Sequence, residues 1–258
     1  MLIPQLLRLV RIDTSLIGFL AIFLALYARS EDLNLSFYRA LPILFICMCT
    51  FIANDLNDIE NDLINHPDRP LPSNEIRPWI AATLYFLILG VGFFVTRDHI
   101  EEPVAFFYYA LFLTSISYSL VADHLPVIKA PYVAAAGAAP ILIGTAWYPE
   151  TGLFILAASA FLITLGREIC MDVQDRPGDV QSVISKLDSK LVVYVGMGLQ
   201  AGGILLLIPR VSSIVELIIL FVMLSILTLA VILWTRMNRR ISIYLMKCIY
   251  LAGLYFLL

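Results

Sequence analysis

Residues 38–62, YRALPILFICMCTFIANDLNDIEND, join sixteen mostly apolar residues to a strongly acidic end. A second stretch, GREICMDVQDRPGD at residues 166–179, follows another apolar run in the same way. Both contain the spacing D-x-x-D-x-x-x-D, at Asp55, Asp58 and Asp62 and again at Asp172, Asp175 and Asp179. We call residues 54–62 the first acidic segment and residues 172–179 the second. Carboxylates beside bilayer-length apolar runs are costly without partners, so the pattern predicts a membrane protein that binds a cation.

The overall composition supports a membrane location. The chain has 258 residues, of which 60% are hydrophobic and 14% are charged, and its mean hydropathy is +0.89. So little polar surface cannot coat a soluble globule of this size. The expected partner is therefore the lipid bilayer, and no nucleic-acid partner is expected.

Apolar runs bounded by charges, prolines and polar turns predict nine membrane spans. We expect helices, because the period-2 alternation of strands is absent and open sheet edges cannot be satisfied in lipid. Some runs fall below the roughly 20 residues of a perpendicular helix, so we expect them to extend into neighbouring polar residues. The spans are residues 14–28, 38–53, 78–96, 103–122, 126–147, 151–169, 191–209, 212–235 and 241–258. The fold class expected is an all-α, polytopic membrane protein with a single domain over residues 1–258.

The first span could also be a secretory signal, because Arg8 and Arg11 precede an apolar run that ends near Ala28. No convincing A-x-A cleavage site follows it, and eight more spans do. We therefore interpret it as an uncleaved first helix.

Basic residues predict the orientation of the nine spans. The larger group lies on the amino-terminal side and comprises Arg8, Arg11, Arg69, Arg77, Lys129, Arg167, Arg176, Lys186, Lys190, Arg236, Arg239 and Arg240. The smaller group on the other side comprises Arg29, Arg39, Arg97 and Arg210. By the positive-inside rule, the N-terminus and both acidic segments face the cytoplasm, and the C-terminus lies on the opposite side.

The first acidic segment can present its carboxylates on one side of a helix. If the preceding span continues through it, Asn54, Asp58 and Asp62 lie at i, i+4 and i+8, with Asp55 on the same broad face. All-oxygen groups suit Mg²⁺, which binds one or two carboxylates and completes its shell with waters and phosphate oxygens. The segment therefore suits Mg²⁺, although it is not a dedicated cage by itself.

The second acidic segment offers a similar set. Asp172 and Asp175 follow Glu168 at helical spacing, and Pro177 with Gly178 should end the helix before Asp179. Arg167 and Glu168 are adjacent on this helix, so they face different directions and need not pair.

Two other interpretations of the acidic segments were weighed. Each could be a solvated acidic loop, but matching spacing and same-side placement in two segments make that the weaker interpretation. A transporter could carry ions or protons along such carboxylates, yet it would place them near the bilayer midplane rather than at one end. An enzyme site is the stronger expectation.

The first acidic segment and its continuation, residues 54–73 with Arg69-Pro-Leu-Pro, resemble the N-D-x-x-D-x-x-x-D motif and R-P-L-P signature of the UbiA superfamily of intramembrane prenyltransferases. Residues 166–179 are similar to that family's second aspartate motif, and Tyr118-Ser119 resembles its fourth-helix pattern. The resemblance covers essentially the whole chain. It implies a bundle of nine helices around a central cavity, with Mg²⁺ bridging an isoprenoid diphosphate.

The resemblance also implies roles for single residues. The metal-binding candidates are Asn54, Asp55, Asp58, Asp62, Asp172, Asp175 and Asp179, and the catalytic candidates are Asp58, Asp62, Asp172, Asp175 and Tyr118. Arg69 is the best diphosphate donor, because it follows the first acidic segment and a guanidinium can bind phosphate with two hydrogen bonds. Snorkelling to lipid headgroups is its alternative role. Weaker diphosphate-binding candidates, which topology alone would also explain, are Lys129, Arg176, Lys186 and Lys190.

Some positions depart from the family pattern, and the departures remove positive charge. Leu63 and His66 stand where many members have basic residues, and Asp123 stands where many have lysine after the tyrosine. The favoured reaction is prenyl transfer to a lipophilic, most readily aromatic, acceptor. The alternative is a UbiA-type terpene cyclase, in which an alkene of the same isoprenoid captures the cation.

Overall fold

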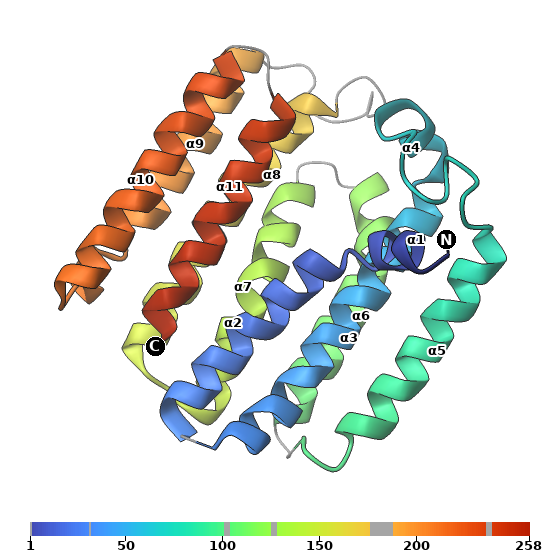
Figure 1. Ribbon diagram of the computed structural model, residues 1–258, viewed down its shortest axis with the longest axis horizontal. Helices are drawn as coiled ribbons and strands as arrows, with labels where there is room; N and C mark the ends of the chain where they lie inside the picture. Colours follow the sequence, from blue (N-terminus) through green and yellow to red (C-terminus); the bar gives the residue numbers. More distant parts are fainter. Residues whose placement is uncertain (1, 31, 101–103, 125–127, 176–187, 236–238) are drawn as a thin grey trace. The chain divides into compact units, whose positions relative to one another are not determined.

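The computed structural model describes residues 2–30, 32–100, 104–124, 128–175, 188–235 and 239–258 (Figure 1). Within these ranges the regular structure is helical, and they contain no strand. The chain forms two compact units, residues 1–124 and 125–258.

The first unit is built around its longest helix. α3 packs against α2, α5 and α6, and a core at one end of it joins Leu9, Ile52, Leu71, Ile76 and Ala81. Leu71 and Ile76 belong to the connection between α4 and α5, so their burial holds this polar connection against α3. The helices of the unit are α1 (Leu2–Leu9), α2 (Ile12–Ser30), α3 (Leu33–Asn57), α4 (Ile59–Asn65), α5 (Pro78–Thr96) and α6 (Val104–His124).

The second unit is built around α8, which packs against α7, α9 and α11. Its closest approach is to α9, because a Cβ placed on Gly166 would lie 2.1 Å from the carbonyl oxygen of Gly196. Small residues of this kind let membrane helices approach backbone to backbone. The elements of the unit are α7 (Lys129–Trp147), α8 (Thr151–Gln174), α9 (Ser189–Leu205), η2 (Ile208–Arg210), α10 (Ile214–Thr235), α11 (Arg239–Gly253) and η3 (Leu254–Leu257).

The helices confirm an all-α, polytopic membrane protein. In the part of the chain that the structure describes, eight helices are long and apolar enough to cross a membrane. They match eight of the expected spans, and the remaining one, residues 103–122, coincides with α6, whose stretch Val104–Thr114 is apolar. The expected extension is also confirmed, because α3 runs to Asn57 and α8 to Gln174, each beyond its apolar run.

Two local features differ from expectation. The first acidic segment is not one continuous helix, because Asp58 leaves helical geometry at φ −93° and ψ 13° and α4 begins after it. Asp58 lies where the apolar run has ended, and short polar side chains there compete with helical hydrogen bonding. The second feature is α1, an eight-residue helix before the first span that we did not expect.

Candidate active site

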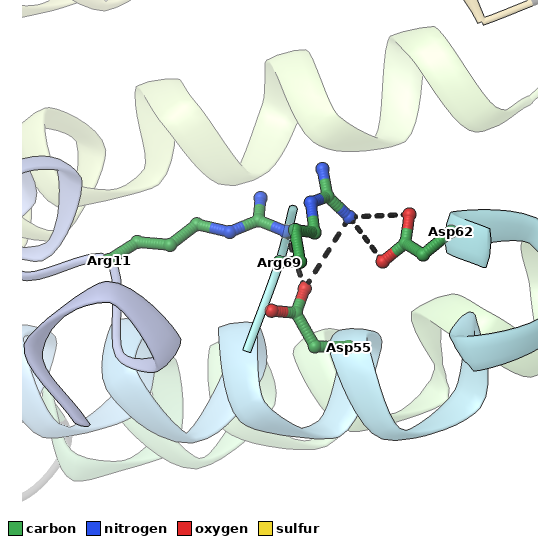
Figure 2. Close-up of polar contacts among 4 residues, drawn as sticks. All are labelled: Arg11, Asp55, Asp62 and Arg69. Atoms are coloured by element: carbon green, nitrogen blue, oxygen red, sulfur yellow. Dashed lines mark hydrogen bonds and ion pairs between the residues drawn. The ribbon is translucent and has the colours of Figure 1, made fainter. Parts of the chain in front are cut away.

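Asp55 and Asp62 are buried carboxylates in the first acidic segment. Asp55 lies near the end of α3 and is 2% exposed, and Asp62 lies in α4 and is 4% exposed. The helix break at Asp58 separates them along the chain. Because burying an isolated carboxylate is costly, each needs a positive partner. Arg69 and Arg11 supply that charge (Figure 2).

Arg69 bridges the two carboxylates. Its Nη1 lies 2.7 Å from Oδ1 and 2.6 Å from Oδ2 of Asp62, and 3.7 Å from Oδ1 of Asp55. Backbone hydrogen bonds fold the connection that carries it; among them, the N–H of Arg69 donates to the carbonyl of His66 and the N–H of Ile76 donates to the carbonyl of Pro70. Sequence reasoning placed Arg69 beside the first acidic segment, and the structure brings it there.

Arg11 is a residue of this site that sequence reasoning missed. Its Nη2 donates to Oδ1 of Asp55 at 2.5 Å, and its guanidinium lies over the ring of Phe51, 4.8 Å from the centroid. Arg11 has a φ of 43°, in the left-handed region that a non-glycine residue rarely adopts. This conformation joins α1 to α2. We had used Arg11 only to orient the chain, and the sequence carries no signal for a contact across 44 positions.

The pKa of Asp62 is raised above its ordinary value. Burial is the largest cause, and the nearby charge of Asp55 adds to it. The charge and hydrogen bonds of Arg69 act in the opposite direction and lower the pKa. Arg69 therefore favours the ionised carboxylate that a metal ion or phosphate-bound cation requires.

The remaining members of the first acidic segment lie beside the break. Asn54 and Asp58 are half-buried, and the backbone N–H of Asp58 donates to the carbonyl of Asn54 at 2.9 Å. The backbone N–H of Asp62 then donates to Asp58 at 2.8 Å. These two hydrogen bonds continue the backbone pairing across the break at Asp58. The four candidate ligands Asn54, Asp55, Asp58 and Asp62 therefore lie on one short hydrogen-bonded stretch of backbone.

The second acidic segment is paired differently. Asp172 is buried in α8, and its Oδ1 lies 3.7 Å from Nζ of Lys129 at the start of α7. The sequence predicts that Lys129 binds diphosphate, and the structure places it beside Asp172, a predicted metal ligand. Asp175 caps α8 and is half-buried, and its backbone N–H donates to Met171.

The structure describes some of the other expected residues and not the rest. Arg167 and Glu168 form an ion pair, so our expectation that they need not pair was wrong; two long side chains on adjacent residues can still meet. Lys190 is exposed in the first turn of α9, where Asp188 caps the helix. The candidates that fall outside the described residues are Arg176, Asp179 and Lys186, together with the side chains of Tyr118 and Asp123.

The donor chemistry of these segments fits Mg²⁺. Among the described residues no group of three or more His, Cys, Asp or Glu side chains converges as a closed metal cage. Mg²⁺ does not require one, because it keeps several waters and takes phosphate oxygens from a substrate. The guanidiniums of Arg11 and Arg69 lie against Asp55 and Asp62, so a metal ion bound there would replace these positive partners.

Comparison with known protein families gives one match over most of the chain. Residues 15–251 match the UbiA prenyltransferase family, so the match includes residues of both compact units.

Curated relatives carry a more specific name. The digeranylgeranylglyceryl phosphate synthase of Pyrococcus abyssi is 34% identical over 154 residues, which cover 58% of this chain and 53% of that protein. The enzyme of the same name from Metallosphaera sedula is 31% identical over 143 residues, which cover 52% of this chain and 48% of that protein. The chain thus spans about half the length of the curated relatives it matches.

Two solved structures have the same fold. A UbiA homologue from Aeropyrum pernix K1 matches with a TM-score of 0.77 at 13% identity, over 94% of this chain and 96% of that one. A structure from work on digeranylgeranylglyceryl phosphate synthase in membranes matches with a TM-score of 0.67 at 23% identity, over 99% of this chain and 97% of that one. At these identities the likeness concerns the fold alone.

Proposed function

The chain belongs to the UbiA prenyltransferase family, and from that premise we propose that it ionises an isoprenoid diphosphate and transfers the prenyl group to a lipophilic acceptor. One observation carries the proposal. Two buried carboxylates, Asp55 and Asp62, are held by two arginines at the end of a membrane span. These carboxylate–guanidinium pairs can separate when substrate binds. The carboxylates can then coordinate a metal ion, and the guanidiniums can donate hydrogen bonds to phosphate.

The acidic residues hold Mg²⁺ in this proposal. Asp55 and Asp62 are the best-supported ligands of the first acidic segment, with Asn54 and Asp58 beside them, and Asp172, Asp175 and Asp179 belong to the second. When bound, Mg²⁺ neutralises the charge that develops on the diphosphate as its bond to the prenyl carbon breaks.

Arginine and lysine residues complete the charge balance. Arg69, whose Nη1 contacts both oxygens of Asp62, can turn from that carboxylate to a phosphate, because a guanidinium can bind phosphate oxygens with two parallel N–H donors. Lys129 supplies a point charge beside Asp172. Arg176, Lys186 and Lys190 are further proposed donors, and Tyr118 is proposed to stabilise the allylic cation through its ring face.

The acceptor that we propose is a glyceryl phosphate carrying a prenyl chain. The support is the name shared by the curated relatives, digeranylgeranylglyceryl phosphate synthase. The aromatic acceptor that the sequence led us to favour is an alternative outcome of the test.

The orientation is also part of the proposal. The basic residues favour a cytoplasmic N-terminus with both acidic segments on that side. Reporter fusions test it: one inserted after Asn74 should read cytoplasmic, and one inserted after Asp98 should read the opposite side.

A product assay tests the reaction. Purified protein in detergent micelles is given geranylgeranyl diphosphate and Mg²⁺ with no acceptor, with geranylgeranylglyceryl phosphate, or with an aromatic acid, and products are identified by mass spectrometry. We expect a diprenylated glyceryl phosphate and one diphosphate for each product. A cyclic terpene formed without acceptor would establish the cyclase instead. Uptake of substrate into sealed vesicles without diphosphate release would exclude both enzymes.

A further inference from the structure

A cavity of about 340 Å³ lies in the first unit between α1, the start of α2 and the connection after α4. Three arginines line it, Arg8, Arg11 and Arg69, together with the apolar side chains of Leu7, Ile12 and Pro70. We propose that this cavity binds the phosphate monoester headgroup of the lipid acceptor. The inference rests on the proposed function, and it assigns the acceptor phosphate to Arg8 and α1.

The charge of the cavity favours an anion. Its lining contains three guanidiniums against the carboxylates of Asp13 and Asp55. Arg11 and Arg69 contact the first acidic segment, where the prenyl diphosphate is proposed to react. Arg8 instead contacts Glu75 and the backbone carbonyl of Asp68. Arg8 is therefore the arginine through which a second phosphate can be recognised separately from the first.

Arg8 has the capacity for this role. Its side chain is 48% exposed and lies at the end of α1, with Nη1 3.1 Å from the Glu75 carboxylate. A guanidinium has five N–H donors in a fixed fork, and the contacts to Glu75 and to the Asp68 carbonyl use two. A phosphate monoester has the acceptor oxygens and the double charge that such a fork binds best.

The apolar part of the cavity favours a lipid over a free phosphate. Leu6 and Leu9 pack α1 onto the core of the unit, whereas Ile3 and Leu7 are 71% and 45% exposed. α1 immediately precedes the span α2, so its exposed apolar side chains lie where a membrane surface is expected. An amphiphile at that surface can put its phosphate near Arg8 and its chain along Leu7.

A binding assay without turnover tests the proposal. The probe is 1-oleoyl lysophosphatidic acid, a glyceryl phosphate monoester with one chain, and binding to purified full-length protein is measured in detergent without Mg²⁺ or isoprenoid diphosphate. Monoolein, which lacks the phosphate, and inorganic phosphate, which lacks the chain, are the comparison ligands. We expect saturable binding of the probe and at least about tenfold weaker binding of either comparison ligand.

Two variants of the same bridge separate recognition from structure. Arg8→Gln should weaken probe binding about tenfold, because a charge-assisted contact is lost. Glu75→Gln should leave binding equal or tighter, because it frees Arg8 from its carboxylate. If the bridge were only structural, both variants would weaken binding alike. Arg97→Gln is the matched control, since Arg97 is a similarly exposed arginine of the same unit that pairs with Asp98.

Each contrary result has a definite meaning. Equal binding of monoolein, or wild-type affinity in Arg8→Gln, would overturn the phosphate site. Equal competition by phosphatidylglycerol would make it a site for general anionic headgroups and overturn the acceptor assignment. Diphosphate release by the wild-type protein given geranylgeranyl diphosphate, Mg²⁺ and geranylgeranylglyceryl phosphate is measured separately, so failure of the proposed function is distinguishable from failure of this inference.

Discussion

The two acidic segments have the same residue spacing but different positive partners. In the first unit, one guanidinium nitrogen of Arg11 contacts Asp55 at 2.5 Å, and one of Arg69 contacts Asp62 at 2.6 and 2.7 Å. In the second unit, Asp172 lies 3.7 Å from the ammonium of Lys129. Arginine fixes carboxylate geometry with directed donors, whereas lysine contributes a point charge on a flexible chain. Equal spacing therefore does not imply equal partners. We interpret the first segment as a site where arginines can exchange carboxylate for phosphate, and the second as a carboxylate paired with a lysine.

The largest effect should come from removing one carboxylate in either segment. Asp62→Asn and Asp172→Asn should each reduce Mg²⁺-dependent diphosphate release at least about 100-fold, because each is proposed to hold metal. The measurement is diphosphate release by purified protein given geranylgeranyl diphosphate and geranylgeranylglyceryl phosphate. Glu60→Gln, an exposed neighbour in the first segment, should keep near wild-type release. Full activity in Asp172→Asn would show that the Asp172 carboxylate is not needed for diphosphate release, and would contradict the metal-binding role of the second segment.

The next effect should come from exchanging arginine and lysine beside the acidic segments. Arg69→Lys should lower kcat/KM about tenfold or more, because a lysine cannot reproduce two parallel donors. Lys129→Arg should change kcat/KM less than about threefold, because a point charge beside Asp172 is retained. Steady-state kinetics of both variants check this. Equal sensitivity of the two positions would show that the arginine geometry has no special role.

A stability effect should show how far the scaffold behind the second acidic segment depends on close helix packing. Gly166→Ala puts a methyl group 2.1 Å from the Gly196 carbonyl, so α8 and α9 must separate, at a cost of about 1–3 kcal/mol. Thermal unfolding in detergent should show a fall of several degrees. Gly198→Ala, where a Cβ meets nothing within 4 Å, should cost little. A neutral Gly166→Ala would mean that close helix packing does not support Asp172.

The smallest effect should be on metal affinity in the absence of substrate. Arg11→Gln removes the closest positive partner of Asp55, so the protein should melt at a lower temperature without Mg²⁺. The same variant should gain more stability from added Mg²⁺, with an apparent affinity about threefold tighter, because ligand binding to the folded state raises stability. A Mg²⁺-induced shift no larger than that of the wild type would argue against competition between Arg11 and metal.

Much of the fold was predictable because lipid imposes a simple rule on sequence. Apolar runs of bilayer length had to become helices, and residues 78–96 coincide with α5. The break at Asp58 was not predictable from periodicity, because the i, i+4 pattern is the same for a straight and a bent helix. α1 was missed since eight residues cannot span a membrane, and its packing through Leu6 and Leu9 is a tertiary effect.

The site was predictable to the level of residue type and neighbourhood. Arg69 follows the first acidic segment closely in sequence, so its pairing with Asp62 could be anticipated. Arg11 and Asp55 meet only because α2 packs against α3, and Lys129 reaches Asp172 because α7 packs against α8. Long-range pairing of charged side chains leaves no spacing pattern in a single sequence.

The claim that the acidic segments bind diphosphate through Mg²⁺ is tested most directly without chemistry. A thiolodiphosphate analogue of geranylgeranyl diphosphate, which resists ionisation, is titrated into wild-type protein, Asp62→Asn and Asp172→Asn, each with and without Mg²⁺. We predict that the wild type binds the analogue only with Mg²⁺ and that each variant loses at least about 100-fold in affinity. Mg²⁺-independent binding, or wild-type affinity in either variant, would contradict the account.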